Sequence, residues 1–109
     1  MRFVQTKRYL RDLKRLGASD LDVARLEQAI ADDPTVGDVI PGLEGLRKVR
    51  FGLGSRGKRG GGRAIYFLMV ADDLVVFVAA FAKSEKENLS PQEKKYALAL
   101  LKEFKDAQS

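Results

Sequence analysis

Seven of the twenty basic residues of this chain fall in the seventeen-residue stretch 47–63, which contains no acidic residue. They are Arg47, Lys48, Arg50, Arg56, Lys58, Arg59 and Arg63. The whole chain carries a net charge of +5, so the residues outside this stretch together carry −2. The positive charge is therefore local, whereas ordinary protein surfaces intersperse the two signs. Such a concentration of Lys and Arg on a small domain indicates a polyanionic partner, most simply nucleic acid.

The chain contains neither His nor Cys, so disulfides, thiolate nucleophiles, Cys-based zinc sites and an imidazole general base are excluded. No clustered Asp/Glu motif indicates a magnesium site, and we expect neither a metal nor a cofactor. Concentrated cations around a phosphodiester would stabilise the added negative charge of a pentavalent transition state. In RNA the 2′-hydroxyl is itself the nucleophile, and a lysine whose pKa is lowered by neighbouring cations could accept its proton.

Strand alternation sorts the first of these basic residues by the face on which they lie. In the strand expected over 46–51, Lys48 and Arg50 point to one face, and Val49 and Phe51 point to the other. A core must bury Val49 and Phe51. The two cations therefore face a groove or solvent.

Arg63 stands near the start of the next expected strand and approaches the same surface if the two strands pair antiparallel. Lys48, Arg50 and Arg63 are then held on rigid elements, which suit catalysis better than loops. A glycine-rich loop is expected over 52–62, and its basic residues would bind phosphates without sequence preference: Arg56, Lys58 and Arg59. The simpler alternative is a solvated loop beside an edge strand that its charge protects from aggregation.

Two nucleotide-binding motifs occur in the glycine-rich segment. Residues 52–57 read G-x-G-x-x-G, and residues 52–58 read G-x-x-x-x-G-K. Both motifs bind phosphate at the N-terminus of a following helix, and the second needs Ser or Thr where Arg59 stands. A strand is expected after this segment, so neither motif predicts a nucleotide site.

An α+β fold follows from the order of the expected elements. Apolar residues at helical spacing predict helices over 7–16, ended by Gly17, and from Ser19 or Asp20 to Asp32. A capping-box signature at 90–93 begins a third helix. Strands are expected over 2–5, 46–51, 63–70 and 74–82. We therefore predict a small antiparallel sheet with two N-terminal helices and a C-terminal helix packed on it.

The 109 residues are enough for one domain, 1–109, with a single modest core. The longest apolar run, 74–82, is far below the ~20 residues of a membrane helix. The first residues pass at once into charged sequence, and no secretory signal is visible. We expect a soluble, cytoplasmic protein that does not bind membranes.

Several segments resemble the RelE/ParE superfamily, and within it the HigB/RelE-type toxins of bacterial type II toxin–antitoxin modules. They are Gly-Leu-Arg-Lys-Val-Arg at 45–50, Gly-Lys-Arg-Gly-Gly at 57–61, Arg-Ala-Ile-Tyr at 63–66 and Lys-Ser-Glu-Lys-Glu-Asn-Leu-Ser at 83–90. The segment 33–40 is similar to that branch as well. The resemblance covers nearly the whole chain, and its most specific part is 33–66.

This resemblance implies a microbial ribonuclease-like fold and a metal-independent endoribonuclease that cleaves mRNA in the ribosomal A site and so inhibits translation. It also implies neutralisation by a cognate antitoxin, which we expect to be a helix-turn-helix protein. Carried over to this sequence, the basic positions of the family fall on Lys48, Arg50 and Arg63, and after the last strand on Lys83 and Lys86. The predicted catalytic residues are therefore Lys48, Arg50, Arg63 and Lys83. The predicted RNA-binding residues are Arg47, Arg56, Lys58, Arg59 and Lys86.

The chain departs from the family pattern in two places, and two other functions stay open. RelE-type enzymes often have a further arginine after the last strand and a tyrosine near the start of the final helix, where this chain has Ser84 and Ser90. The residues that donate and accept the proton are therefore not assigned. Tyr66 is expected to lie in the core and not to take part in catalysis. Tyr96, one turn into the final helix, is only a weak candidate for a polar role in the site. The alternative functions are a non-catalytic RNA- or ribosome-binding module and a ParE-like gyrase inhibitor, against which the strand-borne cations argue.

Overall fold

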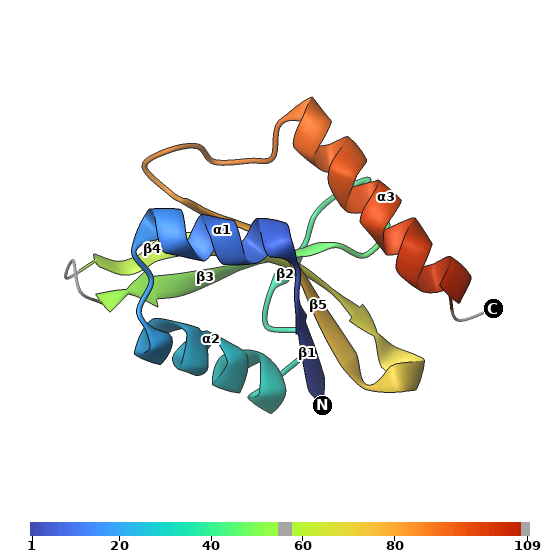
Figure 1. Cartoon of the computed structure of the whole chain (residues 1–109), viewed down its shortest axis with the longest axis horizontal. Coiled ribbons are helices and arrows are strands. Elements are labelled where there is room, and N and C mark those ends of the chain that lie inside the picture. The colour runs from blue at the N-terminus through green and yellow to red at the C-terminus, as the bar shows by residue number, and fades with distance from the viewer. Residues whose placement is uncertain (55–57, 108–109) are drawn as a thin grey trace.

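The computed structural model describes residues 1–54 and 58–107, with the backbone alone at 58–60, and in these residues three α-helices cover a five-stranded sheet (Figure 1). The helices are α1 (Lys7–Leu16), α2 (Asp20–Asp32) and α3 (Pro91–Ala107). The strands are β1 (Arg2–Gln5), β2 (Asp38–Val39), β3 (Arg47–Leu53), β4 (Lys58–Met69) and β5 (Leu74–Ala82). They lie in the order β1-β5-β4-β3-β2 across the sheet.

The predicted α+β class is confirmed, with one difference in the sheet. β3, β4 and β5 form the expected antiparallel meander. β1, however, runs parallel to β5, so the sheet is mixed. Short turns set the direction of neighbouring strands in a meander, but the first and last strands of this chain are joined by no such turn. Nothing in the local sequence therefore determines the direction of β1.

The helix ends lie where the sequence predicts them. Gly17 ends α1 in the left-handed conformation at φ 69°. Ser19 and Asp22 form a capping box at the start of α2. Ser90 and Glu93 do the same for α3, with backbone-to-side-chain hydrogen bonds of 2.8 and 3.1 Å. None of the described helices is long and apolar enough to span a membrane.

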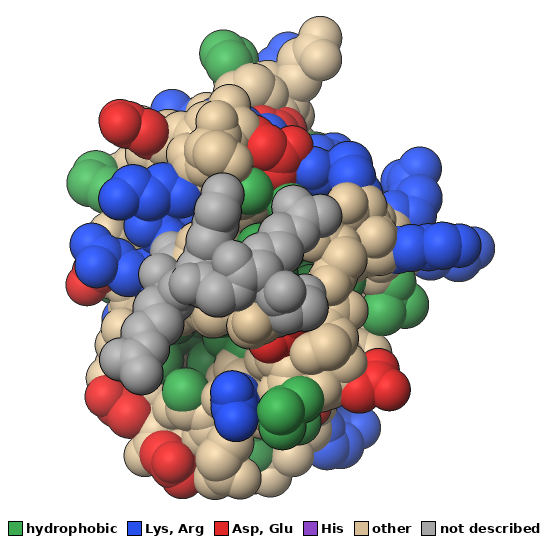
Figure 2. Space-filling model, turned by 90° about the vertical axis from the view of Figure 1, so that its left-hand side faces the viewer, with side chains coloured by type: hydrophobic (Ala, Val, Ile, Leu, Met, Phe, Trp, Pro, Cys, Tyr) green, Lys and Arg blue, Asp and Glu red, His purple; other side chains and the backbone are tan. Residues whose placement is uncertain are grey.

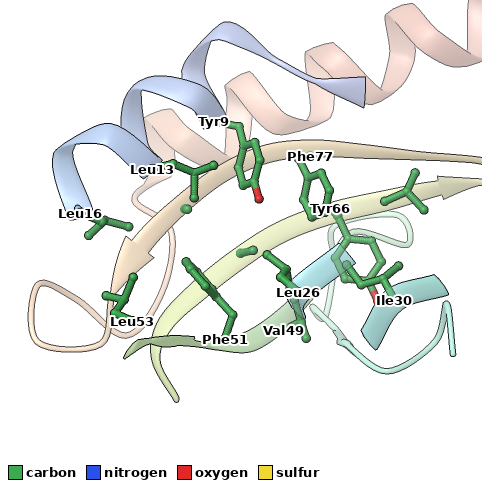
Figure 3. Close-up of a cluster of buried hydrophobic side chains, with 13 residues drawn as sticks. Tyr9, Leu13, Leu16, Leu26, Ile30, Val49, Phe51, Leu53, Tyr66 and Phe77 are labelled. Atoms are coloured by element: carbon green, nitrogen blue, oxygen red, sulfur yellow. The ribbon is translucent and has the colours of Figure 1, made fainter. Parts of the chain in front are cut away.

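The core has two parts, one on each face of the sheet. On the first face, α1 and α2 pack against the strands, and the ring of Tyr9 stacks on Phe77 at 4.5 Å (Figure 3). Tyr66 is fully buried in the same cluster, as the sequence predicts. On the second face, α3 buries Ala97 and Leu101 against the sheet. This arrangement assigns the helices to opposite faces, with the N-terminal pair on one and α3 on the other.

The glycine-rich segment is largely strand, and the loop predicted over 52–62 is wrong for most of its length. β3 continues through Leu53 and β4 begins at Lys58. One reason is that Gly62 pairs across the sheet with Phe51, whose ring lies over it. A Cβ on Gly62 would lie 2.5 Å from Phe51 Cε1. Gly62 is therefore required by the packing of an aromatic ring within the sheet and does not interrupt the strand.

Side chains of α1 replace a missing strand along part of β5. β1 pairs with β5 only from Leu74 to Phe77. Beyond that point the buried carboxylate of Asp12 accepts a hydrogen bond from the Ala80 amide at 3.0 Å. Arg15 donates to the Ala80 carbonyl at 3.3 Å. Both backbone groups of Ala80 are thus satisfied by α1, as buried polar groups must be.

Candidate nucleic-acid interface

A groove of about 350 Å³ lies between β3, β4 and the segment that leads from β5 to α3. Five of the predicted site residues line it, all of them basic: Lys48, Arg50, Arg63, Lys83 and Lys86. We refer to it as the basic groove. Its other lining residues are Asp38, Glu87 and Asn88. The groove thus collects cations from two strands and from the segment after β5, which are far apart in the sequence.

Strand geometry places the first three cations of the groove. Val49 and Phe51 are buried towards α1 and α2, so Lys48 and Arg50 point to the opposite face, as the alternation predicts. Arg63 on β4 is the direct cross-strand partner of Arg50 on β3. Partial burial lowers the pKa of Arg63, and the charge of Arg50 lowers it further. Arginine remains protonated nonetheless, so two positive charges are held side by side and a bound anion would relieve their repulsion.

The segment 83–90 is fastened to the sheet through the cations that it contacts. Lys48 Nζ donates to the Glu87 carbonyl and to Asn88 Oδ1, both at 3.2 Å. Lys86 pairs with Glu93 and lies 5.3 Å from the ring centre of Phe81. These contacts fix the segment that carries the Lys83 and Lys86 side chains.

Glu93 joins this segment to α1 as well as to α3. Its carboxylate accepts from Arg8 at 2.8 Å and from the Ser90 amide at 2.8 Å, in addition to its pair with Lys86. Burial would raise the pKa of Glu93, but the hydrogen bonds from Lys86 and Ser90 lower it to about 2. The carboxylate therefore stays ionised and compensates part of the Lys86 charge.

Of the other predicted RNA-binding residues, the structure places only Arg47, which lies away from the basic groove. Arg47 points to the other face of β3, where it donates to the carbonyls of Gly37 at 2.7 Å and Thr35 at 3.3 Å. It fixes the loop before β2. Arg56 lies outside the described residues, and so do the side chains of Lys58 and Arg59. Their contact with RNA stays a prediction.

Three groove residues are absent from the sequence-based prediction: Asp38, Glu87 and Asn88. No strand is expected at Asp38 from the sequence, but it pairs with Lys48 as part of β2. Glu87 and Asn88 belong to a polar connection whose spacing has no distinguishing pattern. Against five cations, the two acids leave the described lining residues with a net charge of +3.

Basic side chains gather on the upper half of one end of the molecule, and the lower half of that end carries acidic side chains as well (Figure 2). Figure 2 looks onto the end of the sheet that lies at the left of Figure 1, and Lys and Arg side chains predominate in the upper half of that face. Among the described residues, no three Asp or Glu side chains gather closely enough to hold a metal ion.

Comparison with known proteins gives two findings. A family model described as the RelE toxin of the RelE/RelB toxin–antitoxin system matches residues 1–109. Among solved structures, a mutant of the E. coli toxin RelE in the free state is similar with a TM-score of 0.55 and 12% sequence identity, over 89% of this chain and 93% of that chain. At this identity the second likeness speaks for the fold alone, whereas the family match spans the whole chain. Family membership implies a cognate antitoxin as a partner. The chain belongs to the RelE family of toxins of toxin–antitoxin systems.

Proposed function

We propose that this protein is a ribosome-dependent endoribonuclease that inhibits translation by cleaving mRNA in the ribosomal A site. The observation that carries the proposal is the convergence of five cations from β3, β4 and the segment after β5 on one groove. A phosphodiester bound there would lie among several fixed positive charges. Such preorganised charge stabilises the developing negative charge of a phosphoryl transition state without reorganisation.

Arg63 is the central cation of the proposed site. It is partly buried, it lies opposite Arg50, and one of its guanidinium nitrogens donates to the Gly62 carbonyl at 2.9 Å. A planar guanidinium presents a fork of donors that matches two phosphate oxygens. Lys48 and Lys83 add point charges on either side. In this proposal the 2′-hydroxyl of the RNA attacks phosphorus, and no metal takes part.

The proposal includes the ribosome and mRNA as partners, and an antitoxin of the helix-turn-helix type. The described lining of the groove carries a net charge of +3 and would bind naked RNA through phosphate contacts, which are salt-sensitive and carry no sequence information. The ribosome would supply the selection of a cleavage site, which the groove lacks, because it positions one nucleotide of the message. An antitoxin that covers the basic groove would prevent this encounter.

The test compares wild type with Arg63→Ala in a translating extract programmed with a defined mRNA, with 5′-end mapping of the products. Removal of one such donor is expected to slow cleavage by about 100-fold or more. Co-sedimentation with ribosomes should persist because the other cations remain. Arg11→Ala is the matched control, since Arg11 is exposed on α1 and its loss changes the net charge equally.

The competing functions predict different outcomes of the same experiment. A non-catalytic binding module would sediment with ribosomes and stop translation, yet wild type would create no new 5′ ends. A gyrase inhibitor would leave the message intact and block DNA supercoiling in a purified assay. Either result would overturn the proposed endoribonuclease.

A further inference from the structure

The basic groove contains one acid that is carried by a strand, Asp38 on β2. Asp38 is the cross-strand partner of Lys48, so both side chains project from the same face of the sheet. Lys48 does not turn towards it, because its Nζ is held by the Glu87 carbonyl and Asn88 Oδ1. Within the described part of the chain, the Asp38 carboxylate takes part in no hydrogen bond or ion pair.

The backbone that precedes Asp38 is firmly anchored. The Gly37 amide donates to Tyr66 Oη at 3.0 Å, and the Gly37 carbonyl accepts from Arg47 at 2.7 Å. Gly37 is buried, and a Cβ there would lie 2.8 Å from Tyr66 Cε1. A glycine with both backbone groups bonded leaves Asp38 little freedom to move. The main chain at Asp38 is thereby held in place, while its side chain is exposed to solvent.

Among the described residues that line the groove, Asp38 and Glu87 are the two that can accept a proton in their ordinary ionised form. The charged groups that face Asp38 are Lys48 and Arg50 from β3, Arg63 from β4, and Lys83, Lys86 and Glu87 from the segment after β5. Protonated ammonium and guanidinium groups donate hydrogen bonds and have no lone pair to accept a proton. Glu87 lies outside the helices and strands, whereas Asp38 is on a strand.

We propose that Asp38 is the general base of the RNA cleavage reaction, which makes this inference dependent on the proposed function. Its carboxylate takes the proton of the 2′-hydroxyl while the 2′-oxygen forms a bond to phosphorus. The bond from phosphorus to the 5′-oxygen breaks, and that oxygen takes a proton from the Lys83 ammonium. The products are a 2′,3′-cyclic phosphate and a 5′-hydroxyl. The proton on Asp38 and the one lost by Lys83 balance, and no oxidant or co-reactant is needed.

The first test measures single-turnover cleavage of ribosome-bound mRNA by Asp38→Asn, with the protein in excess. Loss of a general base is expected to slow cleavage by about 100-fold or more, while co-sedimentation with ribosomes is kept or strengthened. Asp38→Glu retains a carboxylate and should cleave faster than Asp38→Asn. Glu103→Gln makes the same change in net charge on the exposed surface of α3 and should cleave like wild type.

The second test is the pH dependence of wild type, which needs no variant to fold. A carboxylate is already ionised at neutral pH, so the cleavage rate should change little between about pH 6 and pH 8. A lysine base would make the rate rise about tenfold per pH unit over that range. In Asp38→Asn the residual cleavage should acquire this steep rise, since hydroxide then replaces the missing base.

The results separate this inference from the proposed function. One possible result is that wild type cleaves, Arg63→Ala does not, and Asp38→Asn cleaves at the wild-type rate. Asp38 would then not be the base, and the proposed endoribonuclease function would stand. Loss of cleavage in Glu87→Gln but not in Asp38→Asn would assign the base to Glu87 and overturn the inference. A tenfold rise per pH unit in wild type would overturn it too. If wild type creates no new 5′ ends, the proposed function itself fails.

Discussion

Arg50 on β3 and Arg63 on β4 are direct cross-strand partners, so two guanidinium groups project side by side into the basic groove. Like charges directly opposite one another destabilise a sheet. The lowered pKa of Arg63 has the same cause in part, since the charge of Arg50 adds to the effect of burial. The pair is therefore an arrangement that costs folding stability and that a bound phosphate would stabilise.

Removal of one charge of this pair should stabilise the free protein. Arg50→Gln is expected to raise the free energy of unfolding by about 0.5 kcal/mol at low salt. The gain should shrink in about 1 M salt, because exposed charges are then screened. Urea unfolding at the two salt concentrations measures it. Arg11→Gln, which removes an exposed charge from α1, should show no comparable gain; an equal gain would mean that only the net charge matters.

Glu93 should make stability depend on acid pH. Its pKa falls from the ordinary 4.5 to about 2 in the folded protein. A lowered pKa means that the contribution is complete above the unfolded value of 4.5 and disappears as the pH falls towards 2. Glu93→Gln should therefore cost of order 2 kcal/mol near pH 7 and much less near pH 2. Urea unfolding at the two pH values tests this, with Glu103→Gln as the control; an equal cost at both pH values would contradict it.

Asp12 should stabilise the fold by binding the free edge of β5. Its carboxylate accepts from the buried Ala80 amide at 3.0 Å. Asp12→Ala leaves that amide without its acceptor and should destabilise the fold by about 2 kcal/mol. Asp12→Asn keeps a carbonyl oxygen at the same place and should cost less. Hydrogen exchange at the Ala80 amide measures the loss of this hydrogen bond directly. Protection from exchange should drop in Asp12→Ala. Unchanged protection would show that another group accepts the hydrogen bond of the amide.

Loss of the hydroxyl group should affect the free energy of unfolding differently at two buried tyrosines. Tyr66 Oη donates to the Pro34 carbonyl at 2.8 Å and accepts from the Gly37 amide at 3.0 Å. Tyr9 Oη is buried with no hydrogen-bond partner among the described residues, and burial raises its pKa. Tyr66→Phe should therefore destabilise by about 1–3 kcal/mol, whereas Tyr9→Phe should be neutral or stabilise by about 1 kcal/mol. Thermal unfolding of both variants measures these changes in stability. A large loss of stability in Tyr9→Phe would contradict the prediction, because it would mean that the Tyr9 hydroxyl has a hydrogen-bond partner.

Elements with short-range causes were predictable from the sequence. A capping box needs residues three positions apart, so the start of α3 at Ser90 and Glu93 can be identified without the fold. Strand alternation likewise places Lys48 and Arg50 on one face. The prediction of a loop over 52–62 was wrong for most of its length because glycine is a poor strand former by itself. Pairing with Phe51 and the fit of its ring over Gly62 override that tendency.

By itself the sequence determined the local charge, the predicted helix ends and the shared face of Lys48 and Arg50, because these depend on residues a few positions apart. Only the tertiary structure decided what meets at the basic groove. Distant parts of the chain are joined by the parallel pairing of β1 with β5, by the strand pairing that places Asp38 opposite Lys48, and by the return of the 83–90 segment to Lys48. Such contacts depend on how the whole sheet and its helices pack, and no local pattern encodes them.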